Sequence, residues 1–275
     1  MKLNIRFIYT KICLSLLKVL DPFKKPIGRP NKYTYDFYIK HILNILTSGL
    51  SWNKLSSIIS INTDLIRKKY IKWCKLCLFT KANKIILSQY KKKYNHNCLY
   101  IDSTNIANFT GKLDFGYNIK IKNKRSIKIS TLVDINKVPY ILDISKGSIH
   151  DAKIMESIID TKFKNTKDII EIVGDKGYIK NSSYIENIKT NKNIILITPN
   201  RYNSKNKTEL NYIQQLKSRY KVEHFFSLLK RGYKRISTIN DKTYISYFNF
   251  LNIATSIITL NILPILNKKI TIVPI

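Results

Sequence analysis

The spacing of hydrophobic residues changes near Asn97, and this change constrains the fold more than any other feature of the chain. Before it, apolar residues recur at helical intervals, and helices are expected over residues 33–48, 51–59, 62–75 and 81–92. After it, short apolar runs bounded by turn residues alternate with helical stretches. Such alternation is typical of layered α/β domains, so we expect an α/β domain preceded by a small all-α unit.

The second part of the chain predicts the elements of this α/β domain. Strands are expected over residues 98–102, 117–121, 126–134, 138–145, 168–173 and 194–198, with a hairpin turn at Asn136-Lys137. Helices are expected over residues 150–159, 182–190 and 210–231, and again from Tyr244. With the Pro- and Lys-rich stretch before residue 31, the expected parts are an N-terminal extension and basic linker (1–30), a helical domain (31–95), an α/β domain (96–265) and a tail (266–275).

The charge of the chain points to a polyanionic partner. There are 49 Lys and Arg against 17 Asp and Glu, giving a formal net charge of +32. Self-repulsion of this size destabilises a compact fold unless a polyanion or counterions offset it, and nucleic acid is the commonest such partner. AT-rich codons also favour Lys, but that drift does not by itself explain so few acids.

Four of these cations fall on the predicted helix 62–75, namely Arg67, Lys68, Lys69 and Lys72. A short helix, a tight turn at residues 60–62 and this basic helix resemble a helix-turn-helix, which would bring these side chains to DNA. A plain helical bundle with a solvated basic face fits the same pattern, and the sequence does not separate the two.

No feature of the chain predicts a membrane or secreted protein. The apolar stretch from Ile253 to Leu266 is short and carries Pro264, so a core helix is expected there. The four cysteines have no disulfide pattern, and Cys74 and Cys77 have CxxC spacing without a second ligand pair. They are interpreted as buried thiols in a reducing intracellular compartment.

Two aspartates follow predicted strands. Asp102 ends the strand 98–102, and Asp175 follows the strand 168–173. Ligand groups in α/β sheets gather at the carboxyl ends of strands, so the two can meet although far apart in sequence. For either residue alone, a helix cap or turn is the simpler interpretation.

A third acid, Glu223, lies on the predicted helix 210–231 between two cations. At about 100° per residue, Glu223 lies about 40° and Lys230 about 20° round from Arg219. The three form a narrow polar stripe beside apolar residues, which favours a site. The alternative is a surface ion pair with a solvated lysine.

Three carboxylates are a suitable ligand set for phosphodiester chemistry. An in-line displacement at phosphorus needs charge stabilisation on the attacking and the leaving oxygen, and two hard cations supply it. Magnesium takes oxygen ligands and keeps several waters, so three acids are enough.

Several ordered blocks of the sequence resemble the DDE transposases of bacterial insertion sequences, in the superfamily of insertion sequences four and five. The resemblance covers about residues 28–262. The blocks are Tyr-Ile-Asp102-Ser-Thr, Phe115-Gly-Tyr-Asn-Ile-Lys with Ile129-Ser-Thr-Leu-Val-Asp, Gly147-Ser-Ile-His150-Asp151, Val173-Gly-Asp175-Lys-Gly-Tyr, and Arg219-x3-Glu223-x6-Lys230.

This resemblance implies a fold, an activity and partners. The fold is an RNase H-like mixed five-stranded sheet with flanking helices. Asp102, Asp175 and Glu223 are implied to hold two Mg²⁺ ions, with Mn²⁺ as a substitute, while Arg219 and Lys230 contact DNA or tune the acids. The implied activity is cleavage at element ends and transfer of the 3′-hydroxyl into target DNA. The implied partners are duplex DNA, as terminal inverted repeats and target, and a second copy of the chain on that DNA.

One position departs from the family pattern, and two others have a second interpretation. The family often has Tyr three residues before the arginine, where this chain has Leu216. His150 and Asp151 recur in the family, but an Asp helix cap beside a histidine is the plainer interpretation. The alternatives to a transposase are a catalytically silent DNA-binding derivative and a nuclease of the same fold that does not join strands.

Overall fold

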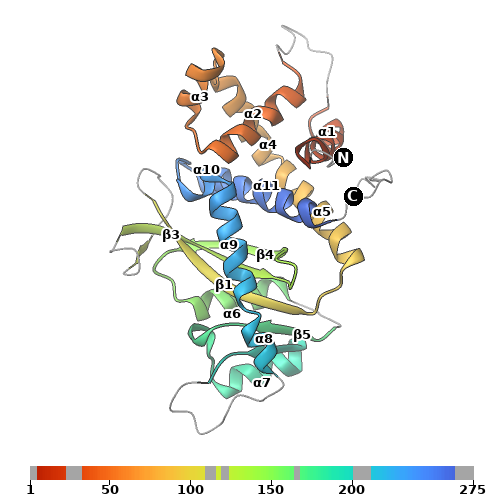
Figure 1. Cartoon of the computed structure of the whole chain (residues 1–275), viewed down its shortest axis with the longest axis vertical. Helices are drawn as coiled ribbons and strands as arrows, with labels where there is room; N and C mark the ends of the chain where they lie inside the picture. Colours follow the sequence, from red (N-terminus) through yellow and green to blue (C-terminus); the bar gives the residue numbers. More distant parts are fainter. Residues whose placement is uncertain are drawn as a thin grey trace. The chain divides into compact units, whose positions relative to one another are not determined.

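The computed structural model describes residues 5–22, 33–108, 116–118, 124–163, 168–200 and 212–263, and these form two compact units. Unit 1 contains the described residues up to Lys93 and those from Leu229 onward. Unit 2 contains the described residues from Tyr94 to Leu228. Figure 1 labels most of the helices and strands of both units.

Unit 1 is all-helical. Its helices are α1 (Ile5–Leu20), α2 (Tyr35–Ser48), α3 (Trp52–Ile59), α4 (Asp64–Lys75), α5 (Leu78–Lys93), α10 (Lys234–Ser237) and α11 (Tyr244–Ile262). Local sequence sets several of their ends. Thr34 and Ser51 cap α2 and α3 through their hydroxyls, and Gly49 ends α2 in the left-handed conformation, with φ of 73°. The four helices expected before Asn97 are therefore confirmed, although α5 begins three residues before the expected start.

The first and last helices of unit 1 were not expected to pack together. Residues 5–20 fall in the expected extension, yet they form α1, which buries Tyr9, Ile12 and Leu17. Helix α11 falls in the expected α/β domain, yet it packs against α5, α1 and α4. Thirteen of the 19 residues of α11 are buried. It is apolar and long enough to span a bilayer, but 78% of its apolar window is buried inside the unit, as expected of a core helix.

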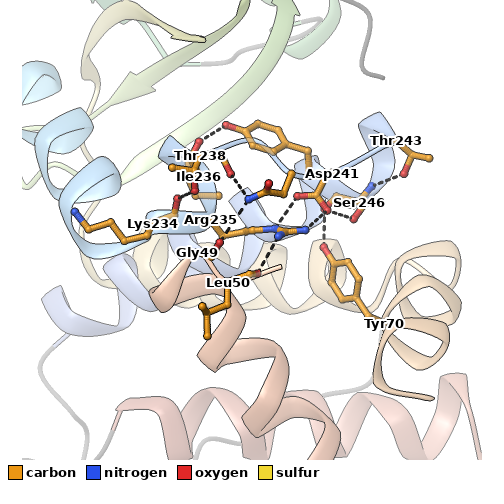
Figure 2. A network of polar contacts seen from close by, with 12 residues as sticks. Gly49, Leu50, Tyr70, Lys234, Arg235, Ile236, Thr238, Asp241, Thr243 and Ser246 are labelled. Carbon is orange, nitrogen blue, oxygen red and sulfur yellow. Dashed lines mark hydrogen bonds and ion pairs between the residues drawn. The ribbon is translucent and has the colours of Figure 1, made fainter. Parts of the chain in front are cut away.

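A buried ion pair joins Arg235 of α10 to Asp241, which lies in the loop before α11 (Figure 2). The Arg235 guanidinium donates two hydrogen bonds to the Asp241 carboxylate, at 3.0 and 3.2 Å, and a third to the carbonyl of Leu50 at 3.0 Å. Ser246 Oγ donates to the same carboxylate at 2.6 Å. Arg235 is 1% exposed and Asp241 3% exposed, so this network is a desolvated part of the core.

Unit 2 is built on a mixed sheet of six strands within the described residues (Figure 1). They are β1 (Cys98–Ala107), β2 (Gly116–Asn118), β3 (Lys124–Val133), β4 (Pro139–Lys146), β5 (Ile170–Val173) and β6 (Ile194–Ile197). The order is β2-β3-β1-β5-β6, and β4 also pairs with β3. β2 and β4 pair with successive parts of β3, opposite β1, so the sheet is five strands wide. The expected fold class is confirmed.

Strand directions follow the connections. β3 pairs antiparallel with β1 and with β4, and Asn136 and Lys137 form the expected β3–β4 turn, where Lys137 has φ of 66°. β5 pairs parallel with both β1 and β6. Parallel strands need crossover connections, and the β4–β5 and β5–β6 connections contain the helices α6 (Asp151–Lys162) and α7 (Ser182–Lys192).

The core of unit 2 lies on one face of this sheet. Leu99 and Ile101 of β1 pack there with α6 residues, including Ile154, Met155 and Ile158. Because side chains alternate along a strand, Tyr100 and Asp102 point to the opposite face. Tyr100 is hydrogen-bonded there to Ser218, which follows helix α8 (Ile213–Lys217).

Two expectations for unit 2 are wrong at their boundaries. β1 runs five residues beyond Asp102, because antiparallel pairing with β3 continues to Ala107, so Asp102 lies inside the strand. The long helix expected over residues 210–231 is two helices, α8 and α9 (Tyr220–Gly232), with Ser218 and Arg219 in the turn between them. Residues 201–211, which join β6 to the segment before α8, lie outside the described residues.

Candidate active site

The parallel pairing of β1 with β5 brings two of the expected acids to the same level of the sheet. Tyr100 pairs with Val173, and Asp102 and Asp175 each follow two residues later. The residues that precede the two aspartates are tightly packed against each other, because a Cβ on Gly174 would lie 3.1 Å from the Ile101 side chain. This register is the reason that residues 73 positions apart can act together.

Asp175 holds the turn that follows β5. Its Oδ1 accepts a hydrogen bond from the Gly177 backbone N–H at 2.7 Å, so it caps the short 3-10 helix η2 (Lys176–Tyr178). The interpretation of Asp175 as a cap or turn former is therefore correct, and it does not exclude a second role for the carboxylate. Its carboxylate is only partly buried and still acts electrostatically on Asp102.

The third acid, Glu223, lies in the first turn of α9. Its carboxylate forms an ion pair with the Arg219 guanidinium, 3.2 Å away, and its side chain is 55% exposed. Arg219 precedes the helix, but the pair retains the expected i,i+4 contact. Lys230 lies two turns further along α9, where burial lowers its pKa. Leu216, the departure from the family pattern, lies in α8.

The pKa of Asp102 is raised to about 6. Burial is the largest cause, since it disfavours the charged form. The Ser103 backbone N–H, which donates to Asp102 at 2.8 Å, and the charge of Arg219 act in the opposite direction. The negative charges of Asp175 and Glu223 raise the pKa further. The three acids therefore come from β1, the β5 turn and α9 and repel one another.

These donors suit a hard divalent cation, although they do not form a closed ligand cluster. Carboxylate oxygens are the ligands that Mg²⁺ prefers, and a cation would relieve the repulsion felt by Asp102. In the described part of the chain, no three His, Cys, Asp or Glu side chains are close enough together to hold a metal ion.

His150 and Asp151 have roles different from those expected. The cap of α6 is His150, whose Nδ1 accepts from the Ala152 N–H at 3.3 Å, so the expectation of an Asp cap is wrong by one residue. Asp151 instead accepts from Lys128 Nζ at 2.8 Å and from Ser103 Oγ at 2.5 Å. Sequence reasoning missed Lys128 and Ser103. The signal was a lysine between Ile127 and Ile129 in a strand, since buried lysines are rare without a partner.

The basic residues of α4 are partly occupied within unit 1. Lys72 donates to Asp21 Oδ1 at 2.6 Å, and Lys69 lies 3.6 Å from Oδ2 and 4.8 Å from the Tyr35 ring centroid. Arg67 pairs with Asp64 at the helix surface, 3.3 Å away, and Lys68 is exposed. Of the four expected DNA-binding residues, Arg67 and Lys68 are thus the two that do not pair with Asp21, although Lys72 is also 53% exposed.

A cleft of about 440 Å³ lies beside the start of β1. Its walls include His96, Tyr100, Glu171 and Gln215, and none of the described residues that line it is Lys or Arg. Its Asn and Gln amides can donate hydrogen bonds, but the described lining offers no lysine or arginine for the DNA backbone. The acids and Arg219 on α9 and β1 offer the better match to phosphodiester chemistry.

Comparisons with known proteins show the family of the chain and structures with a similar fold. Residues 93–257 match a family model described as a transposase DDE domain. The cryo-EM structure of a piggyBac transposase synaptic complex with hairpin DNA matches with a TM-score of 0.50 and 11% identity, over 95% of this chain and 72% of that one. At that identity the likeness shows the fold alone.

A crystal structure of a pre-cleavage Mos1 transpososome matches with 10% identity over 84% of this chain and 96% of that one. Its TM-score of 0.26 carries no argument about the fold. The comparison with curated proteins returned no match.

Proposed function

Because this chain belongs to the transposase DDE domain family, we propose that it cleaves and joins DNA strands with Asp102, Asp175 and Glu223 as its catalytic acids. The family match covers more than half of the 275 residues and contains all three positions. The single observation that carries the proposal is the parallel register of β1 and β5, which brings Asp102 and Asp175 to the same level of the sheet, where the charges of Asp175 and Glu223 act on Asp102.

Metal binding explains why the chain would retain this unfavourable arrangement. We propose that Asp102, Asp175 and Glu223 hold two Mg²⁺ ions, with Mn²⁺ as a substitute. When bound, such ions supply charge stabilisation to the attacking and leaving oxygens of an in-line displacement at phosphorus. The backbone N–H of Ser103 and the guanidinium of Arg219 orient two of the carboxylates.

The rest of the chain would supply DNA contacts. Lys230, Arg67 and Lys68 are proposed to contact phosphate, and the net charge of +32 favours duplex DNA near the site. The substrates would be the terminal inverted repeats of an element and a target duplex. Bringing two ends together implies two copies of the chain on DNA, inside the cell.

The test is a cleavage assay on a plasmid that carries the gene with its natural flanking DNA. Purified protein with Mg²⁺ or Mn²⁺ should cut at the element ends, and Asp175→Ala should lower the rate at least about 100-fold. Asp143→Asn is a matched control, because Asp143 is a half-buried sheet aspartate with a raised pKa on the α6 face. It should cleave like the natural protein.

Two outcomes would replace the proposal. If cleaved ends with free 3′-hydroxyls are never joined to a target plasmid, the protein is a nuclease of the same fold. If the natural protein binds duplex but leaves it intact with either metal, it is a silent DNA-binding derivative.

A further inference from the structure

A chain of hydrogen bonds connects Asp102 to the far side of the sheet. The backbone N–H of Ser103 donates to Asp102 Oδ1 at 2.8 Å. The side chain of the same serine points to the opposite face and donates to Asp151 Oδ1 at 2.5 Å. Lys128 Nζ donates to that carboxylate oxygen at 2.8 Å and to the Ile149 carbonyl at 2.5 Å.

This cluster joins three elements that meet behind the candidate site. Ser103 lies in β1, Lys128 in β3 and Asp151 in the first turn of α6. The Lys128 side chain is 6% exposed and that of Asp151 25%, so water competes little for these bonds. Asp151 therefore restrains the side-chain rotation of Ser103, the residue whose backbone N–H bonds to Asp102.

A second contact brings the Asp175 turn into the same region. Tyr178 ends η2, the turn capped by Asp175, and its side chain is fully buried in the core between the sheet and α6. The charges of Asp102, Asp151 and Asp175 all act on its hydroxyl and help burial to raise its pKa. Asp102 and Asp175, which are proposed to hold metal, are thus both next to the same buried region, formed by Ser103, Asp151 and Tyr178.

We infer that Asp151, paired with buried Lys128 and bonded to Ser103 Oγ, is a positioning residue that holds Asp102 in its metal-binding orientation. The inference rests on the proposed function of Asp102. Groups that orient a metal ligand without touching the metal change its affinity about 10- to 100-fold when they are removed. A purely structural ion pair would change stability and leave metal affinity unaltered.

The sharpest variant is Ser103→Ala, because it breaks the link and leaves the Lys128–Asp151 pair intact. Ser130→Ala is the matched control. Ser130 is the register partner of Ser103 in β3, is 2% exposed, and its hydroxyl has no hydrogen-bond partner in the described part of the chain. Ser103→Thr restores a hydroxyl donor at the same position.

The measurement is Mn²⁺ affinity of the full chain by titration calorimetry, with thermal unfolding of each variant alongside. We expect Ser103→Ala to weaken Mn²⁺ binding about 10-fold, Ser103→Thr to stay within about twofold, and Ser130→Ala to match the natural protein. Asp102→Ala should abolish the signal. The inference is overturned if Ser103→Ala binds Mn²⁺ normally, if Ser130→Ala weakens binding equally, or if the natural protein binds no Mn²⁺.

DNA cleavage by the same samples separates this inference from the proposed function. If Mn²⁺ affinity changes as expected but the natural protein never cuts DNA, the proposed function fails and the positioning role stands. If the natural protein cuts DNA and Ser103→Ala retains full Mn²⁺ affinity, the positioning role fails and the proposed function stands.

Discussion

Asp102 is a residue at which function and stability oppose each other. Burial and two neighbouring carboxylates raise its pKa to about 6, against an ordinary value of 3.8. Since the folded-state pKa is the higher one, folding is penalised while Asp102 is ionised. The penalty is full above about pH 6 and disappears as the pH falls below about 4.

The substitution Asp102→Asn should therefore stabilise the metal-free protein. About two pKa units correspond to at most about 3 kcal/mol, and partial solvent access reduces this to about 1–3 kcal/mol. Urea unfolding at about pH 8 should show this gain, and the gain should vanish near pH 4. A variant that is less stable than the natural protein at pH 8 would contradict the electrostatic account of the site.

At the scale of elements, helix α4 has two kinds of cation. Lys69 and Lys72 neutralise Asp21 within unit 1, whereas Arg67 pairs with the exposed Asp64 and Lys68 is exposed. Burial opposes the ionisation of Asp21, but hydrogen bonds from Lys72 and Trp73 and the charge of Lys69 outweigh it, and the pKa of Asp21 is lowered. Composition alone does not separate a cation used for folding from one used for DNA.

Replacing Arg67 and Lys68 together with alanine should weaken DNA binding and leave the melting temperature nearly unchanged. Each lost phosphate contact reduces the slope of log K against log salt by about 1, so fluorescence anisotropy across a salt series measures the effect. Lys72→Ala should instead lower thermal stability. Equal DNA affinity of the double variant and the natural protein would exclude α4 from the interface.

The network between α10 and α11 predicts a large stability effect within unit 1. Arg235→Met leaves the buried Asp241 carboxylate without its bidentate partner, which costs about 3–5 kcal/mol. Asp241→Asn should also destabilise the protein, and the double variant should lose less than the sum of the two. Additive losses in chemical denaturation would show that the two side chains do not act as a pair.

At the scale of the whole molecule, the sequence predicts elements better than it predicts their partners. Caps such as Thr34 and Gly49 set helix ends locally, so those helices were predictable. The end of β1 was not, because the polar residues after Asp102 look like a loop until β3 pairs with them. No Gly or Pro marks the helix break at Ser218, so the break was not predictable. The apolar pattern of α11 predicts that the helix is buried, but it does not predict that α1 and α5 are the helices that cover it.

The same difference applies to the candidate site. Asp102 and Asp175 follow from strand patterns, and Glu223 from its helical spacing to Arg219. The hydrogen bond from Ser103 to Asp151 does not follow from any sequence pattern, because it joins residues 48 positions apart through the packing of α6 on the sheet. Nothing local in the sequence encodes such a contact.

The two-unit organisation makes a prediction about fragments. A fragment of residues 1–95 contains α1–α5 but lacks α11, whose buried face fills the centre of the helical unit. We expect this fragment alone to lack a cooperative thermal transition by circular dichroism. Co-expression with residues 229–263 should restore it. A fragment 1–95 that unfolds cooperatively by itself would contradict the assignment of α11 to this unit.

The most direct test of the central claim is X-ray diffraction near the manganese absorption edge, from crystals of the natural protein grown with Mn²⁺. The account predicts anomalous peaks within about 2.5 Å of carboxylate oxygens of Asp102, Asp175 and Glu223. These peaks should be absent from crystals of Asp102→Ala. Manganese bound elsewhere, or the three carboxylates left apart at saturating Mn²⁺, would contradict it.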